Sequence, residues 1–106
     1  MIDIFIDNNS LEELRTIIKK LYPKSIVWAY GSRIGYNVNN VHDGSDLDLT
    51  VIDFGQDKHN ISEFKTVFQE SNIPFLIDIS EFSTLPLSFQ KEIKKKYFVV
   101  YDGQNN

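Results

Sequence analysis

Cysteine is absent from the 106-residue sequence, which excludes a disulfide framework and a thiolate metal site. No apolar run approaches the ~20 residues that a membrane-spanning helix needs. The segment from Met1 to Asp7 has acidic residues where a signal peptide has basic ones, so we expect a cytoplasmic protein with no membrane partner. Lys and Arg number 11 against 15 Asp and Glu, and the net charge of −4 argues against a nucleic-acid partner.

The apolar residues are numerous enough to form one hydrophobic core. They make up 42% of the sequence, and aromatic residues make up 13%, which is too much for a disordered chain. The sequence contains no internal repeat, low-complexity segment or linker. We therefore expect residues 1–106 to form a single domain.

The spacing of the apolar residues predicts an α/β (α+β) protein, with a small mixed β-sheet and helices packed on it. Helices are expected over residues 11–21, 60–70 and 84–95, and strands over 25–30, 46–53, 75–79 and 97–101. Residues 2–6 alternate apolar and acidic side chains, which fits either a short edge strand or a loosely docked arm. The segment from Tyr36 to Gly44 is rich in Asn and is expected to be a loop.

The ends and faces of the helices give further expectations. One of Asn8, Asn9 and Ser10 is expected to cap the first helix, with Glu12 and Glu13 in its first turn. In the last helix, Pro86 fits the first turn, and Phe89 and Ile93 are expected to face the core. Lysines 91, 94, 95 and 96 are expected to form a solvated face of that helix.

Two carboxylates in the second strand are candidates for chemistry. Side chains of a strand alternate between its faces, so Asp46 and Asp48 point the same way. Asp43-Gly44 precedes them as a hairpin-type turn, which favours an antiparallel return toward the strand over 25–30. For such a pair alone, a half-exposed strand with its polar face in water is the simpler interpretation. Asp78 adds weight to the chemical interpretation, because it is the one acid in an apolar strand and converges with the pair if the two strands are neighbours.

Three clustered carboxylates need a counter-charge. Two of them ~5 Å apart repel by roughly 3 kcal/mol at an effective dielectric constant near 20. Oxygen ligands suit Mg²⁺ or Mn²⁺, and Mg²⁺ commonly shares its ligand shell with substrate phosphates. The acids therefore predict two metal ions that stabilise an in-line phosphoryl or nucleotidyl displacement.

A Gly-Ser pair at the end of the first main strand is suited to phosphate. Gly31 has no Cβ, so phosphate oxygens can approach the backbone, and successive N–H groups in a turn form an anion-binding nest. The hydroxyl of Ser32 can donate a further hydrogen bond to a phosphate oxygen. Gly-Ser alone is usually only a turn, so the prediction rests on the order of the motifs. An apolar strand is followed by Gly-Ser, a loop, Ser-Asp-x-Asp and a later strand with one Asp.

These residues resemble a known family. The segments Gly31-Ser32-Arg33-x-Gly35 and Ser45-Asp46-Leu47-Asp48-Leu49, followed by Asp78, are similar to the nucleotidyltransferase domain of the DNA polymerase β superfamily. The length resembles the minimal nucleotidyltransferases, the MNT antitoxins of HEPN/MNT toxin–antitoxin pairs. The resemblance spans Leu11 to about Tyr101 and implies a polymerase β-like fold.

The resemblance also implies an activity. A metal-dependent nucleotidyltransferase of this kind moves AMP, or another nucleoside monophosphate, from a triphosphate such as ATP to a hydroxyl. In the antitoxin branch the acceptor is a tyrosine of a helical HEPN toxin, which the modification silences. The alternative is a non-catalytic antitoxin that neutralises the HEPN partner by binding it. Whether the chain also forms a homo- or hetero-oligomer stays open.

The resemblance assigns a role to each motif residue. Asp46, Asp48 and Asp78 are expected to be catalytic and to hold two Mg²⁺ or Mn²⁺ ions. The nucleotide is expected to contact residues of the two short motifs, namely Gly31, Ser32, Arg33 and Ser45. A solvated surface position is the alternative for Arg33. The thirteen residues between Ser32 and Asp46 exceed the usual spacing, which is expected to reshape partner contacts without moving the strands.

Other residues and functions fit less well. His42 and His59 are isolated, and Asp53 is expected to be a strand-end acid without a partner. Trp28 and Tyr30 fit core positions better than a base-stacking platform, although Tyr30 precedes Gly31 and is placed to line a nucleotide pocket. A sugar-nucleotide transferase would need a larger sheet, and the acidic spacing does not match an EF-hand.

Overall fold

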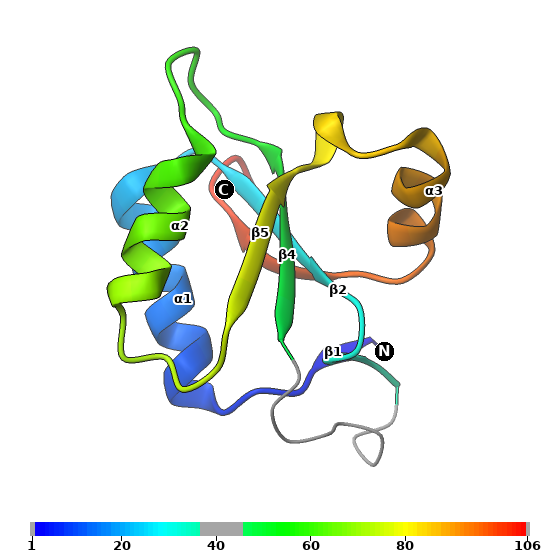
Figure 1. Ribbon diagram of the computed structural model, residues 1–106, viewed down its shortest axis with the longest axis horizontal. Coiled ribbons are helices and arrows are strands. Elements are labelled where there is room, and N and C mark those ends of the chain that lie inside the picture. Colours follow the sequence, from blue (N-terminus) through cyan, green and yellow to red (C-terminus); the bar gives the residue numbers. More distant parts are fainter. Residues whose placement is uncertain (1, 37–45, 106) are drawn as a thin grey trace.

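A computed structural model describes residues 2–36 and 46–105 of the chain (Figure 1). Residues 37–45 lie outside this range, and with them most of the predicted loop, the predicted Asp43-Gly44 turn, Ser45 and His42. Within the described part of the chain, no helix is long and apolar enough to cross a membrane.

The main sheet has four strands in the order β5-β4-β2-β6. Their bounds are Ile26–Tyr30 for β2, Leu47–Asp53 for β4, Ile77–Glu81 for β5 and Phe98–Asp102 for β6. The central strand β2 pairs antiparallel with β4 and β6, and β4 pairs parallel with β5. The predicted mixed α/β class and the antiparallel return onto β2 are confirmed.

A second, two-stranded sheet is formed by the N-terminal residues. Strand β1 (Asp3–Ile4) pairs antiparallel with β3 (Ile34–Gly35), which follows the Gly31 turn. The N–H of Phe5 also donates to the carbonyl oxygen of Arg33 at 2.7 Å. Of the two interpretations of residues 2–6, the short strand is therefore correct. Its hydrogen bonds hold residues 33–35, which follow the Gly-Ser turn, in position.

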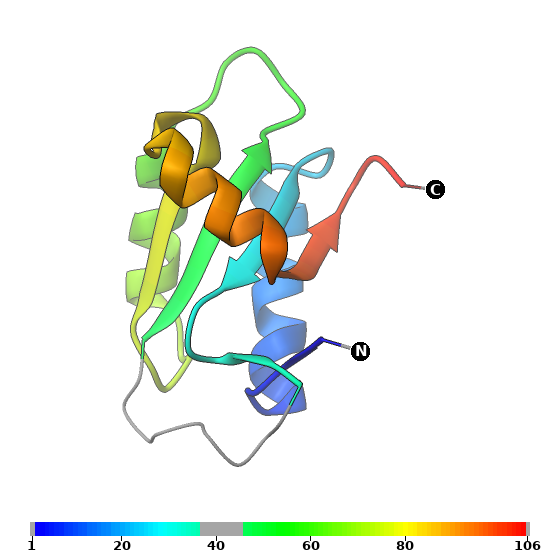
Figure 2. The same ribbon diagram turned by 90° about the vertical axis from the view of Figure 1, so that its right-hand side faces the viewer.

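Helices cover both faces of the main sheet. Figure 1 shows α1 (Asn8–Leu21) and α2 (Ile61–Glu70) on one face and α3 (Leu87–Lys95) on the other. Figure 2 views the sheet from the α3 side, where β5 and β4 are left largely uncovered at the end from which they start. This uncovered end carries the candidate site.

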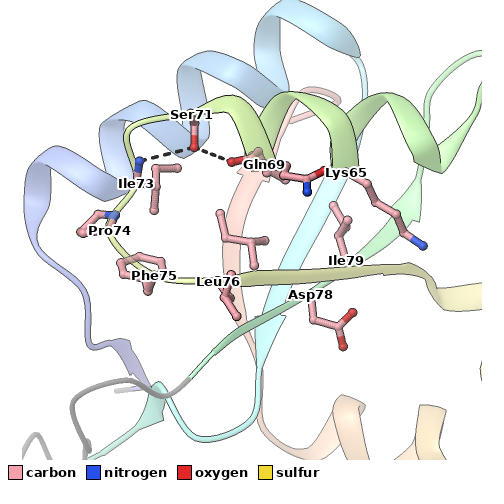
Figure 3. Close-up of a pocket in the computed structure, with 11 residues that line it drawn as sticks. Lys65, Gln69, Ser71, Ile73, Pro74, Phe75, Leu76, Asp78 and Ile79 are labelled. Atoms are coloured by element: carbon pink, nitrogen blue, oxygen red, sulfur yellow. Dashed lines mark hydrogen bonds between the residues drawn. The ribbon is translucent and has the colours of Figure 1, made fainter.

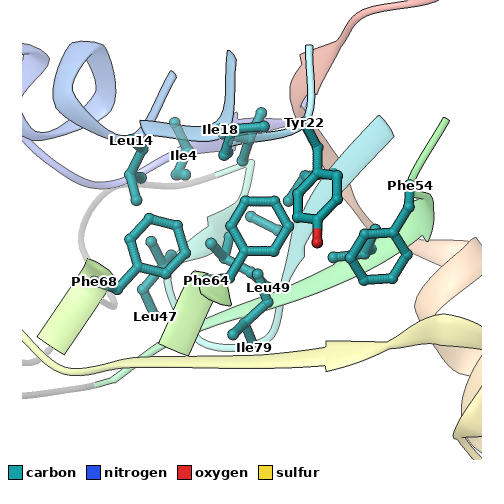
Figure 4. Close-up of a cluster of buried hydrophobic side chains, with 14 of the residues drawn as sticks. Ile4, Leu14, Ile18, Tyr22, Leu47, Leu49, Phe54, Phe64, Phe68 and Ile79 are labelled. Carbon is teal, nitrogen blue, oxygen red and sulfur yellow. The ribbon is translucent and has the colours of Figure 1, made fainter. Parts of the chain in front are cut away.

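The core lies between the sheet and the α1 and α2 helices (Figure 4). Leu14 and Ile18 of α1 and Phe64 of α2 are completely buried against Leu47 and Leu49 of β4. Each such side chain contributes about 1.5–3 kcal/mol through its burial. The alternation in β4 thus turns Leu47, Leu49 and Val51 inward and leaves the positions between them on the α3 face.

Several predicted boundaries and contacts were wrong. Helix α1 begins one turn early because Asp7 caps it, accepting hydrogen bonds from the N–H and hydroxyl of Ser10 at 3.1 and 2.6 Å, so its first turn contains no acid. Strand β5 starts at Ile77 rather than residue 75. A short 3-10 helix, Phe82–Thr84, precedes α3, and Pro86 is the residue before α3 rather than in its first turn.

Two side chains also differ from expectation. Phe89 is 40% exposed instead of facing the core, whereas Ile93 is buried as predicted. Asp53 ends β4 but has partners, since its carboxylate accepts hydrogen bonds from the N–H of Gly55 at 2.8 Å and from Nε2 of Gln104 at 3.0 Å. The bond from Gln104, followed by that from Gly55, lowers the pKa of Asp53.

Candidate functional site

Two of the three predicted acids face each other across neighbouring strands. Asp48 of β4 and Asp78 of β5 are register partners in the parallel pair. Register partners lie about 4.8 Å apart along the hydrogen-bonding direction and share one face of the sheet. Asp46 immediately precedes β4 and is exposed, as Asp78 is, while Asp48 is half-buried. The structure therefore brings Asp48 and Asp78 together from segments thirty residues apart.

The negative charges in this cluster influence one another. Burial raises the pKa of Asp48, and the charges of Asp78 and then Asp46 raise it further. Because Asp46 affects the pKa of Asp48, its carboxylate lies within the range of electrostatic interaction with Asp48, although Asp46 precedes the paired residues of β4. A group with this environment favours a bound cation, which lowers the energy of the ionised form.

Gly31 lies directly beside Asp48. Its φ of +87° is in the left-handed region, where glycine alone avoids a steric penalty. A Cβ built on Gly31 would lie 2.5 Å from Oδ2 of Asp48, so a side chain here would push the carboxylate out of its position. The absence of a side chain therefore both permits the turn and allows the Asp48 carboxylate to lie against its backbone.

Tyr30 flanks the acids on the other side. It is the register partner of Asp48 in the antiparallel β2–β4 pair. Burial, followed by the charges of Asp48 and Asp78, raises the pKa of its phenol, so Tyr30 stays neutral and is available as a hydrogen-bond donor. The ring of Phe89 packs edge-on against it, with centroids 5.6 Å apart.

Phe89 was not recognised as a site residue from the sequence. Its helical spacing with Ile93 predicted a core position, whereas the structure places it over Tyr30 and leaves it partly open to solvent. No local pattern distinguishes these outcomes, because the position of α3 on the sheet is a tertiary property. Trp28 lies on the same face of β2 as Tyr30, where it is stacked on Tyr97 with centroids 3.8 Å apart.

Arg33 is buried rather than solvated. It is only 9% exposed, so the solvated surface position is wrong. The guanidinium carbon lies 4.5 Å from the ring centre of Phe75, and Nη1 donates a hydrogen bond to the carbonyl oxygen of Phe5 at 3.2 Å. These contacts connect the Gly-Ser turn to the N-terminal strand and to the segment before β5. A phosphate contact by Arg33 stays a prediction.

The remaining polar candidates differ in their distance along the chain from the acids and the Gly31 turn. Ser32 is exposed next to Gly31, which suits its expected contact with the nucleotide. His59 stacks on Phe54, with centroids 4.1 Å apart, and its Nε2 lies 3.6 Å from Oε1 of Glu81 at the far end of β5. The predicted solvated lysine face of α3 is confirmed, since Lys91, Lys94, Lys95 and Lys96 are exposed.

The residues at this site suit a divalent cation in their chemistry. Within residues 2–36 and 46–105, no three His, Cys, Asp or Glu side chains are close enough to form a complete metal site. Asp48 and Asp78 nevertheless supply carboxylate oxygens, with Asp46 in electrostatic range, and Mg²⁺ takes only one or two carboxylates when phosphate oxygens complete its shell. The Asp48 carboxylate lies directly against the Gly31 turn, so the candidate metal ligand and the candidate phosphate-binding backbone are neighbours.

A groove of about 720 Å³ runs along β5 on the side of α2 (Figure 3). Its wall combines the C-terminal half of α2, the connection through Pro74 and the first residues of β5, including Leu76 and Asp78. Figure 3 shows the side chains of Asp78 and Ile79 on opposite sides of β5, so the groove reaches the edge at which the acidic face begins.

Comparison with known proteins reveals one informative relative. The chain is 32% identical over 100 residues to a protein of Haemophilus influenzae named probable protein adenylyltransferase MntA. The aligned region covers 93% of this chain and 85% of the relative. No family model matches the sequence.

Proposed function

Since this chain belongs to the MntA family of protein adenylyltransferases and is a nucleotidyltransferase, we propose that it transfers AMP from ATP to a hydroxyl of a partner protein. The observation that carries this proposal is the register pairing of Asp48 with Asp78, beside a glycine turn that has no room for a Cβ. Carboxylates and an open backbone turn are the groups that a metal-bound triphosphate requires.

Each motif residue has a role in the proposed reaction. The backbone at Gly31 and the hydroxyl of Ser32 hold the triphosphate. The acceptor hydroxyl oxygen forms a bond to the α-phosphorus, the bond from that phosphorus to the bridging oxygen breaks, and pyrophosphate leaves. Asp78 orients the acceptor hydroxyl and takes its proton. The neutral phenol of Tyr30 is available to donate to an oxygen near Asp48.

A divalent metal belongs to this proposal. Asp46, Asp48 and Asp78 are the residues that would hold two Mg²⁺ or Mn²⁺ ions, which neutralise the phosphate charge and stabilise the attacking and leaving oxygens when bound. Two observations support this: the raised pKa of Asp48 and the side-by-side carboxylates of Asp48 and Asp78.

The proposed acceptor is a tyrosine of a HEPN-type toxin, which would make the chain an antitoxin. This step rests on the resemblance of the Gly-Ser and Asp-x-Asp motifs to MNT antitoxins. The name of the relative, which describes a protein adenylyltransferase, supports a protein acceptor rather than a small molecule. Ser45 and Arg33 complete the proposed nucleotide site.

Transfer of label tests the proposal. The protein is incubated with ATP labelled on the α-phosphate, Mg²⁺ and the protein encoded by the neighbouring gene, and label is followed on that protein. We expect label with the wild type and at least a 100-fold loss in Asp48→Asn and Asp78→Asn, with folding retained. Chelation of the metal is expected to stop transfer, and added Mg²⁺ or Mn²⁺ to restore it.

The controls separate catalysis from binding. Asp57→Asn, an exposed acid in the loop after β4, is the matched control and is expected to leave transfer unchanged. Toxin neutralisation without label, in the wild type and in the Asp48 variant alike, would favour the non-catalytic antitoxin and contradict the proposed transfer.

A further inference from the structure

Strand β5 is an open edge of the main sheet. It pairs with β4 on one side and, within the described residues, has no strand on the other. The carbonyl oxygen of Leu76 accepts a hydrogen bond from the N–H of Leu47 at 2.9 Å, which fixes the direction of the backbone groups. Because successive groups of a strand point to opposite sides, Ile77 and Ile79 direct their N–H and C=O groups to the open edge.

The groove lies beside these free backbone groups. Apolar side chains dominate its wall, and Lys65 and Asp78 are the charged residues in it. Leu76 is 73% exposed at its start, close to Ile73 and Phe75 (Figure 3). An exposed leucine beside unpaired strand groups is the combination that receives an additional strand in peptide recognition.

The groove and the candidate catalytic acids meet at Asp78. Side chains of a bound extended segment would alternate, as those of any strand do. One residue would therefore enter the apolar groove under α2, and the next would project onto the face that carries Asp78 and Asp48. A hydroxyl on this second residue would lie on the face of Asp48 and Asp78, where the acceptor of the proposed transfer has to be.

We propose that the open edge of β5 and its groove bind an extended segment of the acceptor protein, whose hydroxyl-bearing residue is flanked by apolar residues. The inference rests on the proposed function, since the segment is the one that receives AMP. The backbone of the segment pairs with Ile77 and Ile79. Leu76 shares the face of Asp78, so an apolar side chain two residues from the hydroxyl-bearing one packs on Leu76, while the side chain between them enters the groove. An acidic residue further along the segment pairs with Lys65, which lies at the α2 side of the groove.

A matched pair of exposed leucines tests this inference. Leu76→Gln alters the groove, and Leu87→Gln alters α3 on the opposite face, where Leu87 is 74% exposed. With the neighbouring gene's product as acceptor, we expect Leu76→Gln to raise the KM for that protein about tenfold. Its kcat at saturating acceptor and its KM for ATP are expected to stay unchanged, as are all constants of Leu87→Gln.

A second variant tests the strand pairing itself. Ile77→Pro removes an outward N–H without removing a bond to β4, so the fold is expected to survive and the KM for the acceptor protein to rise about tenfold. Wild-type KM values in Leu76→Gln, or equal increases in Leu76→Gln and Leu87→Gln, would overturn the inference while leaving the transfer reaction intact. Absence of label with the wild-type protein would overturn both.

Discussion

Gly31 and Asp48 are so close that a Cβ on the glycine would lie 2.5 Å from Oδ2 of the carboxylate. Gly31 follows the last residue of β2, and Asp48 lies near the start of β4. The antiparallel pairing of β2 with β4 brings the two residues together. The position of the Asp48 carboxylate therefore depends on the absence of a side chain at Gly31 as well as on the strand pairing. This relationship leads directly to the first prediction.

Gly31→Ala is expected to abolish nucleotide transfer and to lower the free energy of unfolding by about 1–2 kcal/mol, because alanine is strained at positive φ and its Cβ displaces Asp48. Gly55→Ala is the control, with φ of +76° and a Cβ that would lie 2.3 Å from the carbonyl oxygen of Lys24. We expect urea unfolding to show a loss in both variants and transfer to fail in Gly31→Ala alone. Equal activity in the two variants would contradict the role of this turn.

Asp48→Asn is expected to change the pH dependence of stability in metal-free solution. The pKa of Asp48 is raised in the folded state, chiefly by burial and then by Asp78 and Asp46. The folded protein therefore binds the proton of Asp48 more tightly than the unfolded chain does, and protonation of Asp48 stabilises the folded state. This stabilisation is complete below the unfolded pKa near 3.9 and is lost as pH rises through the folded pKa. The variant should gain stability relative to the wild type between pH 4 and 7, measured by urea unfolding with a chelator present. A difference that is constant with pH would contradict this.

Tyr22→Phe is expected to lower the free energy of unfolding by about 1–3 kcal/mol without affecting transfer. The buried hydroxyl donates to Oε1 of Glu63 at 2.7 Å and accepts the N–H of Asn60 at 2.9 Å, so its removal leaves both groups without this partner. Tyr101→Phe is the control, because that hydroxyl donates to the carbonyl oxygen of Pro23 at 2.7 Å in an exposed position, and we expect a loss of about 0.5 kcal/mol. Thermal and urea unfolding measure both, and similar losses would contradict the structural role of Tyr22.

Arg33→Gln separates a structural role from phosphate binding. The stacking on Phe75 and the hydrogen bond to Phe5 are both lost, so we expect the free energy of unfolding to fall by about 1–2 kcal/mol. Affinity for a non-hydrolysable ATP analogue, measured by calorimetry, is expected to fall about tenfold, because Arg33 belongs to the proposed nucleotide site. A loss of stability with a change in affinity of less than threefold would contradict the phosphate contact and leave Arg33 with a structural role alone.

Much of the architecture could be predicted because it follows from local patterns. The α1 stripe of Leu14 and Ile18 has the helical period, and the alternation of Leu47, Leu49 and Val51 identifies a strand with one buried face. The same period of two put Asp48 on the opposite face of that strand. The turn at Gly31 was predictable as well, since an apolar strand ended there.

The sequence alone determined the main helices and strands, the side of β4 on which Asp48 lies and the glycine turn after β2, because helix and strand periods act over a few neighbouring residues. The pairing of Asp48 with Asp78, the covering of Tyr30 by Phe89 and the burial of Arg33 on Phe75 were decided only by tertiary structure. These contacts join segments far apart in the chain, and their register depends on how the whole core packs rather than on any local pattern.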